Sequence, residues 1–188
     1  MLEIGDLKVE YKDFNLSVNL PPLESKIYSV MGPSASGKST FLAALSGFQS
    51  ISKGEIFWKR KQITHLHPSK RPIAMLFQEN NLFPHLSAER NIGLALKTGF
   101  RFSNIDKNKV HSSLERVGLA GCNKKRPAEL SGGQQSRVAL ARVLLQNKPI
   151  LLLDEPFSAL GPALKLEMLD LVQEVARENN TLVLMVTH

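Results

Sequence analysis

The first third of the chain carries the apolar and polar pattern of β-strands. Between residues 2 and 20, apolar and polar side chains alternate with the period of two that half-buried strands show, and Lys12-Asp13 is the expected turn of an antiparallel pair. Residues 39–47 interrupt this pattern with a helix that ends at a glycine. Short apolar runs predict three further strands, over 26–32, 54–63 and 71–78.

From Ser87 onward the pattern is helical, and it later alternates between strands and helices. Three helices are predicted, over 88–97 behind the N-cap Ser87, over 107–119, and between Glu129 and Asn147. Continuous apolar runs at 150–155 and 181–188 are typical of buried strands in a parallel sheet, and Pro162 suits the first turn of a helix between them. This order predicts one α/β domain over 1–188, in which a helical lobe at 81–147 interrupts a core of 1–80 and 148–188.

Charge and cysteine content limit the class of protein further. The formal net charge of +7 favours an acidic neighbour, either a nucleic acid or an anionic membrane surface. Because no aromatic residues are interleaved with the short basic clusters, such as Lys59-Arg60-Lys61, we expect no nucleic-acid partner. The single cysteine, Cys122, excludes an internal disulfide framework. No apolar run reaches the roughly 20 residues that span a bilayer, and the start of the chain lacks a signal peptide's apolar core, so we expect a cytosolic chain.

A glycine-rich segment after the strand at 26–32 has the spacing of a phosphate-binding loop. It matches G-x-x-x-x-G-K-[ST] and lies between a predicted strand and a predicted helix. Backbone N–H groups at the helix start can surround phosphate, while Lys38 reaches the β and γ oxygens and the Ser39 hydroxyl binds Mg²⁺. We therefore expect ATP and Mg²⁺ as ligands, held by Gly32, Pro33, Ser34, Ala35, Ser36, Gly37, Lys38, Ser39 and Thr40.

Two acids at the end of a buried strand supply the second half of a hydrolysis site. Asp154 and Glu155 follow a run of apolar residues and emerge where ligands bind in open α/β sheets. Asp154 is the expected Mg²⁺ ligand, and Glu155 is the expected general base that polarises the attacking water. Neighbouring residues on a strand point to opposite sides, so the two acids have different roles.

Residues 130–142, LSGGQQSRVALAR, contain a second candidate anion site, because Ser131 is a predicted helix N-cap followed by two glycines. This segment resembles the signature of the ATP-binding-cassette superfamily, and the resemblance extends over essentially the whole chain. It implies a P-loop NTPase core with a parallel sheet, an N-terminal antiparallel β subdomain and an inserted helical subdomain. It also implies a head-to-tail homodimer in which the partner's ATP would contact Ser131, Gly132, Gly133 and Gln134.

The other motifs of the superfamily occur in the same order along this chain. Gln78 matches the glutamine that reaches Mg²⁺ and water, and His188 matches the histidine that contacts the γ-phosphate. The resemblance therefore implies catalytic roles for Gln78 and His188 beside Glu155, and it adds Gln78 to the metal ligands. Tyr11 has the position of an aromatic residue that stacks on adenine, although a lone tyrosine there fits sheet packing equally well.

Two positions depart from the family's usual pattern. Ala35 replaces a glycine of the loop, so we expect nucleotide binding with some backbone strain at this residue. Gly161 stands where the family usually has an aspartate that communicates across the dimer, which predicts weaker coupling between the two ATP sites. As a helix cap, a glycine at this position costs a few tenths of a kcal/mol relative to aspartate.

Three classes of protein compete for this combination of motifs. A DNA-repair ATPase of the superfamily would need a long coiled coil between Gln78 and the signature, and no heptad run fills that interval. A P-loop kinase that phosphorylates a small molecule has no use for LSGGQ. A transporter motor uses every motif and is therefore the expected class.

Several segments resemble importer ATPases more closely, in particular those that import thiamine. The resemblance rests on MLFQENNLFPHLSAERNIGLAL, on LLLDEPFSALGPALKLEMLDLV and on TLVLMVTH. Importers of iron, sulfate or polyamines are the alternatives. The resemblance implies a peripheral subunit on the cytoplasmic face of the bacterial inner membrane. Transmembrane permease subunits would be its partners, and a periplasmic solute-binding protein would be an indirect one.

Overall fold

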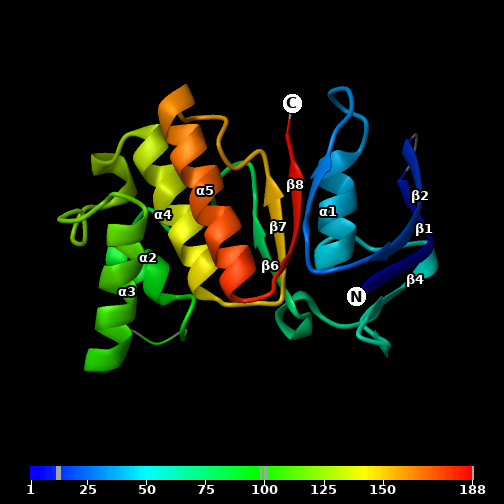
Figure 1. Ribbon diagram of the computed structural model, residues 1–188, viewed down its shortest axis with the longest axis horizontal. Coiled ribbons are helices and arrows are strands. Elements are labelled where there is room, and N and C mark those ends of the chain that lie inside the picture. The colour runs from blue at the N-terminus through cyan, green and yellow to red at the C-terminus, as the bar shows by residue number, and fades with distance from the viewer. Residues whose placement is uncertain (12–13, 98, 100, 188) are drawn as a thin grey trace.

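Two four-stranded sheets form the framework of the protein (Figure 1). The computed structural model describes residues 1–11, 14–97, 99 and 101–187, with the side chain of Tyr11 outside the described part. The antiparallel sheet has the strand order β2 (Phe14–Leu23), β1 (Leu2–Tyr11), β4 (Lys53–Trp58) and β5 (Lys61–Gln62). The parallel sheet has the order β3 (Ile27–Val30), β8 (Leu182–Val186), β7 (Ile150–Asp154) and β6 (Ile73–Leu76).

Five α-helices in the described part cover the parallel sheet or extend from it. They are α1 (Lys38–Ser46), α2 (Ala88–Gly93), α3 (Asn104–Arg116), α4 (Gly132–Leu145) and α5 (Pro162–Glu178), with short 3₁₀ turns at Pro68–Lys70 and Pro127–Glu129. Figure 1 shows α4 and α5 side by side on one face of the parallel sheet, while α1 lies between its other face and the antiparallel sheet. The α/β class predicted from the sequence is confirmed.

The strand β7 explains why the parallel sheet is covered on both faces. All five of its residues are buried, and they pair with β6 on one side and β8 on the other. Leu151 and Leu153 pack into the apolar cluster that contains α4 and α5, whereas Leu152 packs into the cluster that contains α1. Successive side chains of a strand point to opposite faces, so a continuous apolar run buries both.

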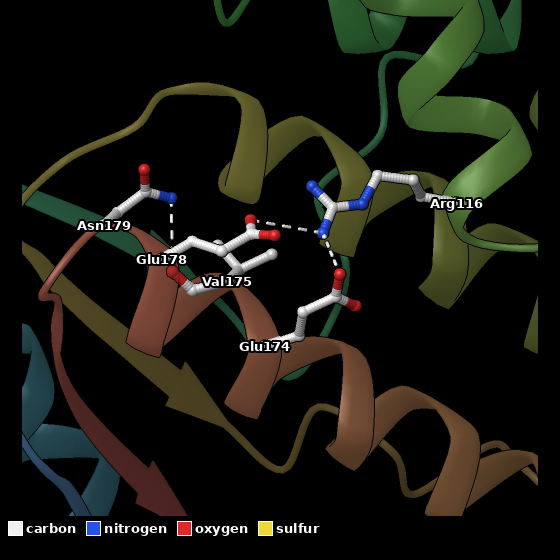
Figure 2. A network of polar contacts seen from close by, with 5 residues as sticks. All are labelled: Arg116, Glu174, Val175, Glu178 and Asn179. Atoms are coloured by element: carbon white, nitrogen blue, oxygen red, sulfur yellow. Dashed lines mark hydrogen bonds and ion pairs between the residues drawn. The ribbon is translucent and has the colours of Figure 1, made fainter.

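The helical segment between β6 and β7 shares its apolar core with α5. Val138 and Leu140 of α4 lie in the same buried cluster as Leu171 and Val172 of α5. Figure 2 shows a second junction between them, where Arg116 at the end of α3 reaches two acids of α5. Its Nη2 atom lies 3.4 Å from a carboxylate oxygen of Glu174 and 3.5 Å from one of Glu178. All three side chains are about half exposed, so each ion pair contributes at most ~1 kcal/mol.

Serine side chains cap α2, α3 and α4, and the bounds of two predicted helices differ from the expected ones. Ser87 caps α2 as expected, accepting a hydrogen bond from the Arg90 N–H, but α2 ends at Gly93 instead of continuing to 97. The Phe102 ring packs directly against Gly93, where a Cβ would lie 2.2 Å from it. The predicted helix over 107–119 begins earlier, at Asn104, because Ser103 forms a capping box there.

The segment 54–63 is a hairpin, so its prediction as a single strand is wrong. β4 ends at Trp58, and Lys59 and Arg60 adopt φ angles of 49° and 64° before β5 pairs back. Two left-handed residues in succession make the two-residue turn that matches the twist of an antiparallel pair. The Lys59 ammonium lies 5.6 Å from the centre of the Trp58 ring, a cation–π contact that accompanies the turn.

A buried arginine joins α1 to the segment that leads into β6. Arg71 is only 4% exposed, and burial lowers the pKa of its guanidinium. Its nitrogens donate hydrogen bonds to four backbone carbonyl oxygens, those of Ala44 (3.0 Å), Leu45 (2.6 Å), Thr64 (2.5 Å) and Leu66 (3.0 Å). Because Ala44 and Leu45 belong to the last turn of α1, the cation also satisfies carbonyls that the helix leaves unpaired.

Candidate nucleotide site

The glycine-rich loop lies between β3 and α1 and turns through two left-handed residues. Ala35 has a φ of 60°, which confirms the expected backbone strain, and Gly37 has a φ of 91° as the N-cap of α1. The Ser36 N–H donates to the Pro33 carbonyl oxygen at 3.3 Å and closes the turn. A Cβ at Gly37 would lie 2.7 Å from Cζ of Phe14 in β2, so the antiparallel sheet packs directly against this loop. The geometry exposes backbone N–H groups at the start of α1.

Lys38, the first residue of α1, is folded back over the loop. Its Nζ donates hydrogen bonds to the carbonyl oxygens of Gly32 (2.8 Å) and Pro33 (2.6 Å). The ammonium group therefore lies against the same loop that presents the backbone N–H groups. An anion bound by the loop would meet both the helix N-terminus and this cation. Ser39 is exposed and Thr40 half-buried in the same first turn.

Asp154, the last residue of β7, is a buried carboxylate beside this loop. It is 4% exposed, and its Oδ1 has no hydrogen-bond partner among the residues that the structure describes. Burial raises the pKa of Asp154, and the charge of Glu155 raises it further, whereas a hydrogen bond with Ser39 and the charge of Lys38 lower it. An unsatisfied carboxylate oxygen next to a hydroxyl offers the hard oxygen donors that Mg²⁺ prefers, so the residues fit the predicted metal.

Glu155 leaves the sheet in a strained conformation. Its φ is 46°, and its N–H donates to the carbonyl oxygen of Val186 in β8 at 3.2 Å. The half-buried residue lines a cavity of about 480 Å³ together with Ser158, Lys165 and Thr187. A left-handed glutamate that is fixed at a strand end has a defined direction, as a group that must aim at one water molecule requires.

Gln78 lies in an exposed turn two residues beyond β6. Since Leu76 of β6 pairs in parallel with Leu153 of β7, the turn of Gln78 and the two acids leave the sheet at the same edge. Sequence reasoning missed what holds this turn. Arg142 of α4 donates hydrogen bonds to the backbone carbonyls just after Gln78, and no local pattern signals a contact between residues so far apart in the chain.

The signature residues lie at the start of α4, where side chains already cap the helix. The Ser131 hydroxyl accepts from the Gln134 N–H at 3.3 Å, and the Gln134 side chain accepts from the Ser131 N–H at 3.0 Å. Ser131 and Gly132 are exposed, while a Cβ at Gly133 would lie 3.1 Å from the Leu160 side chain. Since α1 and α4 lie on opposite faces of the parallel sheet, the signature does not join the loop of its own chain (Figure 1).

Two of the expected contacts fall outside the described residues. The Tyr11 side chain and the whole of His188 are not described, so stacking on adenine and contact with the γ-phosphate stay predictions. In the described part, no group of three or more His, Cys, Asp or Glu side chains could hold a metal ion. A metal at Asp154 would therefore need a hydroxyl and phosphate oxygens as further ligands. No helix in that part is long and apolar enough to span a bilayer.

The loop at the carboxyl edge of a parallel sheet, with its lysine and the buried carboxylate opposite, defines a P-loop nucleotide-binding protein. A family model described as ABC transporter matches residues 12–158, and the chain belongs to this family of ATP-binding proteins. The match includes both the glycine-rich loop and the signature. It confirms the resemblance of the sequence to the ATP-binding-cassette superfamily.

Individual relatives and solved structures agree with this family over the full chain. The chain is 49% identical to the thiamine import ATP-binding protein ThiQ of Ruegeria sp. (strain TM1040), of which it covers 81%. It is 45% identical to the protein of the same name from Brucella suis biovar 1 (strain 1330), of which it covers 78%. A dimeric structure of the ATP-binding cassette MJ0796, in a post-hydrolysis state with ADP and Pi, superimposes with a TM-score of 0.89. It is 30% identical, and the match covers all of this chain and 88% of that one.

Proposed function

We propose that this protein is the ATP-hydrolysing subunit of an importer that carries thiamine across the bacterial inner membrane. Thiamine is proposed as the cargo because the chain is 43–49% identical, over its whole length, to thiamine import ATP-binding proteins of several species. The fold and the phosphate-binding loop support the ATPase chemistry. Importers of iron, sulfate or polyamines remain the alternatives that the experiment below must exclude.

The loop and Lys38 bind the phosphates in this proposal. Backbone N–H groups of the loop and of the first turn of α1 surround the β-phosphate, and the Nζ of Lys38 exchanges the carbonyls of Gly32 and Pro33 for phosphate oxygens. The exchange keeps the ammonium group fully hydrogen-bonded, so it carries little desolvation cost. Tyr11 would stack on the adenine ring.

Glu155, Gln78 and His188 form the hydrolytic group. Ser39, Asp154 and Gln78 would hold Mg²⁺, whose positive charge would neutralise the β and γ oxygens. Glu155 accepts a proton from the attacking water, and its fixed backbone directs the carboxylate towards one position. Gln78 orients that water, and His188 contacts the γ-phosphate from the end of the last strand.

A homodimer completes each site. The dimeric cassettes among the structural relatives support an arrangement in which Ser131, Gly132, Gly133 and Gln134 of one copy contact the γ-phosphate held by the other. The N-terminus of α4 is exposed and therefore accessible to a second copy. Binding of two ATP molecules would close the dimer, and hydrolysis would open it.

A groove beside Gln78 is the proposed seat of the membrane subunit. It has a volume of about 500 Å³ and is lined by Phe48, Phe77 and Phe83, and the Phe48 and Phe83 side chains are 60% and 47% exposed. Phe48 and Phe77 meet edge to face with ring centres 5.1 Å apart. An apolar groove of this kind suits a short helix of a permease subunit. The protein would then be peripheral on the cytoplasmic face of the membrane.

We also propose that the chain is divided as the motifs imply, with 81–147 as a helical subdomain and 1–80 with 148–188 as the core. The two parts share the apolar core of α4 and α5, so the division is one of chain segments and roles. At the edge of that core, Arg116 of the helical segment forms half-exposed ion pairs with Glu174 and Glu178 (Figure 2).

The test is uptake of labelled thiamine in cells that depend on this gene. Lys38→Ala should abolish uptake, while Lys61→Ala, which removes an exposed lysine of β5, should leave it unchanged. Equal uptake with and without Lys38 would exclude thiamine as cargo, and labelled iron, sulfate and polyamines would then be tested in the same cells. In parallel, Glu155→Gln should trap an ATP-bound dimer, and normal turnover in that variant would contradict the role of Glu155.

A further inference from the structure

We propose that Arg142 is a positioning residue for ATP hydrolysis, which fastens the turn of Gln78 to the helix that carries the signature. The inference rests on the proposed function, since it assumes that Gln78 acts at the hydrolytic site and that α4 contacts the partner's nucleotide. It assigns a role to a side chain that touches neither nucleotide.

The guanidinium of Arg142 grips two consecutive peptide groups of the turn. Nη1 donates to the carbonyl oxygen of Asn81 and Nη2 to that of Asn80, both at 2.9 Å. Asn80 is held a second time, because its side-chain Nδ2 donates to the Ser136 hydroxyl of α4 at 3.1 Å. A planar fork that binds two acceptors fixes direction as well as distance, which a lysine could not do.

The turn needs such a clamp because its backbone is unfavourable. Asn80 and Asn81 have φ angles of 52° and 44°, in the left-handed region. Asparagine tolerates that region better than most residues, but two such residues in succession persist only where the surroundings hold them. Both carbonyls that Arg142 binds belong to these residues. The contact and the strained conformation therefore stabilise each other.

The continuation of the turn is also held by the helical segment. Asn91 of α2 is fully buried, and its Oδ1 accepts from the Phe83 N–H at 2.8 Å. Its Nδ2 donates to the carbonyl oxygens of Phe83 and Leu86, both at 3.1 Å. Residues 80–87 are thus fastened to α2 and α4, while Gln78 lies between them and the parallel sheet.

The consequence is a direct connection between two half-sites in one chain. Arg142 lies three turns along α4 from Ser131, or about 16 Å at the helical rise of about 1.5 Å per residue. A helix of this length moves as a rigid rod, so a displacement at Ser131 reaches Arg142 and, through Asn80, Gln78. Contact of the signature with a partner's ATP would in this way position Gln78 for hydrolysis in the chain's own site.

The same helix provides a matched control. Arg137 of α4 also binds two consecutive carbonyls, donating from Nη1 to Val117 at 3.0 Å and to Gly118 at 3.2 Å. These acceptors follow α3 and belong to the helical segment itself. Loss of Arg137 removes hydrogen bonds of the same kind and leaves the turn of Gln78 attached.

The experiment compares Arg142→Ala, Arg142→Lys and Arg137→Ala by ATPase kinetics and by amide hydrogen exchange. In Arg142→Ala we expect kcat to fall by about tenfold or more with KM for ATP within about twofold, because the loss affects the positioning of a catalytic group and leaves the phosphate loop intact. Exchange of amides 78–83 should rise in the same variant. Arg142→Lys should restore only part of both, since it keeps the charge without the fork.

Arg137→Ala should keep kcat within about twofold of the wild type and raise exchange near 117–119. The inference is overturned if Arg142→Ala retains normal kcat, or if Arg137→Ala lowers kcat and exposes 78–83 to the same extent. A wild-type protein without ATPase activity would refute the proposed function instead. Even in that case, amide hydrogen exchange of residues 78–83 can be compared between Arg142→Ala and Arg137→Ala. A rise in Arg142→Ala alone would show that Arg142 attaches the turn of Gln78 to α4.

Discussion

The N-termini of α1 and α4 are both predicted to meet phosphate, but they are built differently. The N-cap of α1 is Gly37, a left-handed glycine without a side chain that could cap the helix. The N-cap of α4 is Ser131, which forms a complete capping box with Gln134. The first helix therefore presents open N–H groups, whereas two of the corresponding groups at the second are already hydrogen-bonded by its own side chains.

This difference separates a site that is preorganised in one chain from a site that a partner must open. An anion at α1 adds hydrogen bonds without displacing any cap. At α4 it must first compete with the Ser131 and Gln134 side chains, which already occupy the capping hydrogen bonds. We infer that a single chain binds ATP through the loop of Lys38, and that the signature contributes only in the dimer.

The largest effect is expected from exchanging glycine for alanine at the two helix starts. Gly37→Ala would place a Cβ 2.7 Å from the Phe14 ring at a left-handed φ, so the free energy of unfolding should fall by about 1–3 kcal/mol. At Gly132 a Cβ would meet nothing within 4 Å in the described part, and Gly132→Ala should stay within about 0.5 kcal/mol of the wild type. Urea denaturation measures both. If both variants lost the same free energy of unfolding, the proposed difference between the N-termini of α1 and α4 would be wrong.

A smaller loss is expected from removing the cap of α4. Ser131→Ala should lower the free energy of unfolding by about 1 kcal/mol, because one N–H loses its acceptor. ATP binding to the isolated chain, measured by calorimetry, should remain unchanged. If Ser131→Ala weakened ATP binding in the monomer, the signature would already be part of the single-chain site.

Asp154 gives an effect of opposite sign in the absence of Mg²⁺. Its pKa is raised by burial, so the folded protein holds this proton more tightly than the unfolded chain does. The free energy of unfolding should therefore fall as the pH rises from the ordinary aspartate value through the folded pKa, and Asp154→Asn should not show this fall. In EDTA the variant should gain stability over the wild type as the pH rises above the ordinary aspartate value. If the difference in free energy of unfolding between Asp154→Asn and the wild type did not change with pH, burial would not be the cause that raises the pKa of Asp154.

The smallest effect concerns the cap of α5. Gly161 is the N-cap of this helix, with φ and ψ of −70° and 161°, and a Cβ there would meet nothing within 4 Å of described atoms. Gly161→Asp should raise the free energy of unfolding by a few tenths of a kcal/mol, since the carboxylate can accept from the first helical N–H groups. It should also strengthen cooperativity between the two ATP sites if Gly161 weakens their coupling. Thermal denaturation and the Hill coefficient of the ATPase report these two effects.

Local patterns predicted most elements because their signals lie within a few residues. The alternation before residue 20, the glycine that ends α1 and the apolar run of β7 each follow from neighbouring side chains. The hairpin at Lys59 and Arg60 was missed because both residues adopt a left-handed conformation without a glycine or asparagine to signal the turn. The basic cluster there indicates an exposed surface, and it does not indicate a change of direction.

The candidate site likewise contains residues that local sequence predicts and a contact that it does not predict. The phosphate loop and the acids at 154–155 are contiguous motifs, so spacing alone identifies them. The attachment of Gln78 to α4 depends on a hydrogen bond between Arg142 and the carbonyls of Asn80 and Asn81, which only the folded chain brings together. Arginine bound to backbone carbonyls has no sequence signature, because every residue offers the same acceptor.

Because Arg71 binds backbone carbonyl oxygens, its contacts respond to the ionic environment differently from ion pairs. Its four acceptors are peptide oxygens, which neither titrate nor attract counterions in the way that carboxylates do. High salt would weaken the half-exposed contacts of Arg116 with its two glutamates, yet leave the attachment of α1 in place. The N-terminus of α1 forms part of the phosphate site, and its C-terminal turn is held by hydrogen bonds that are insensitive to the ionic environment.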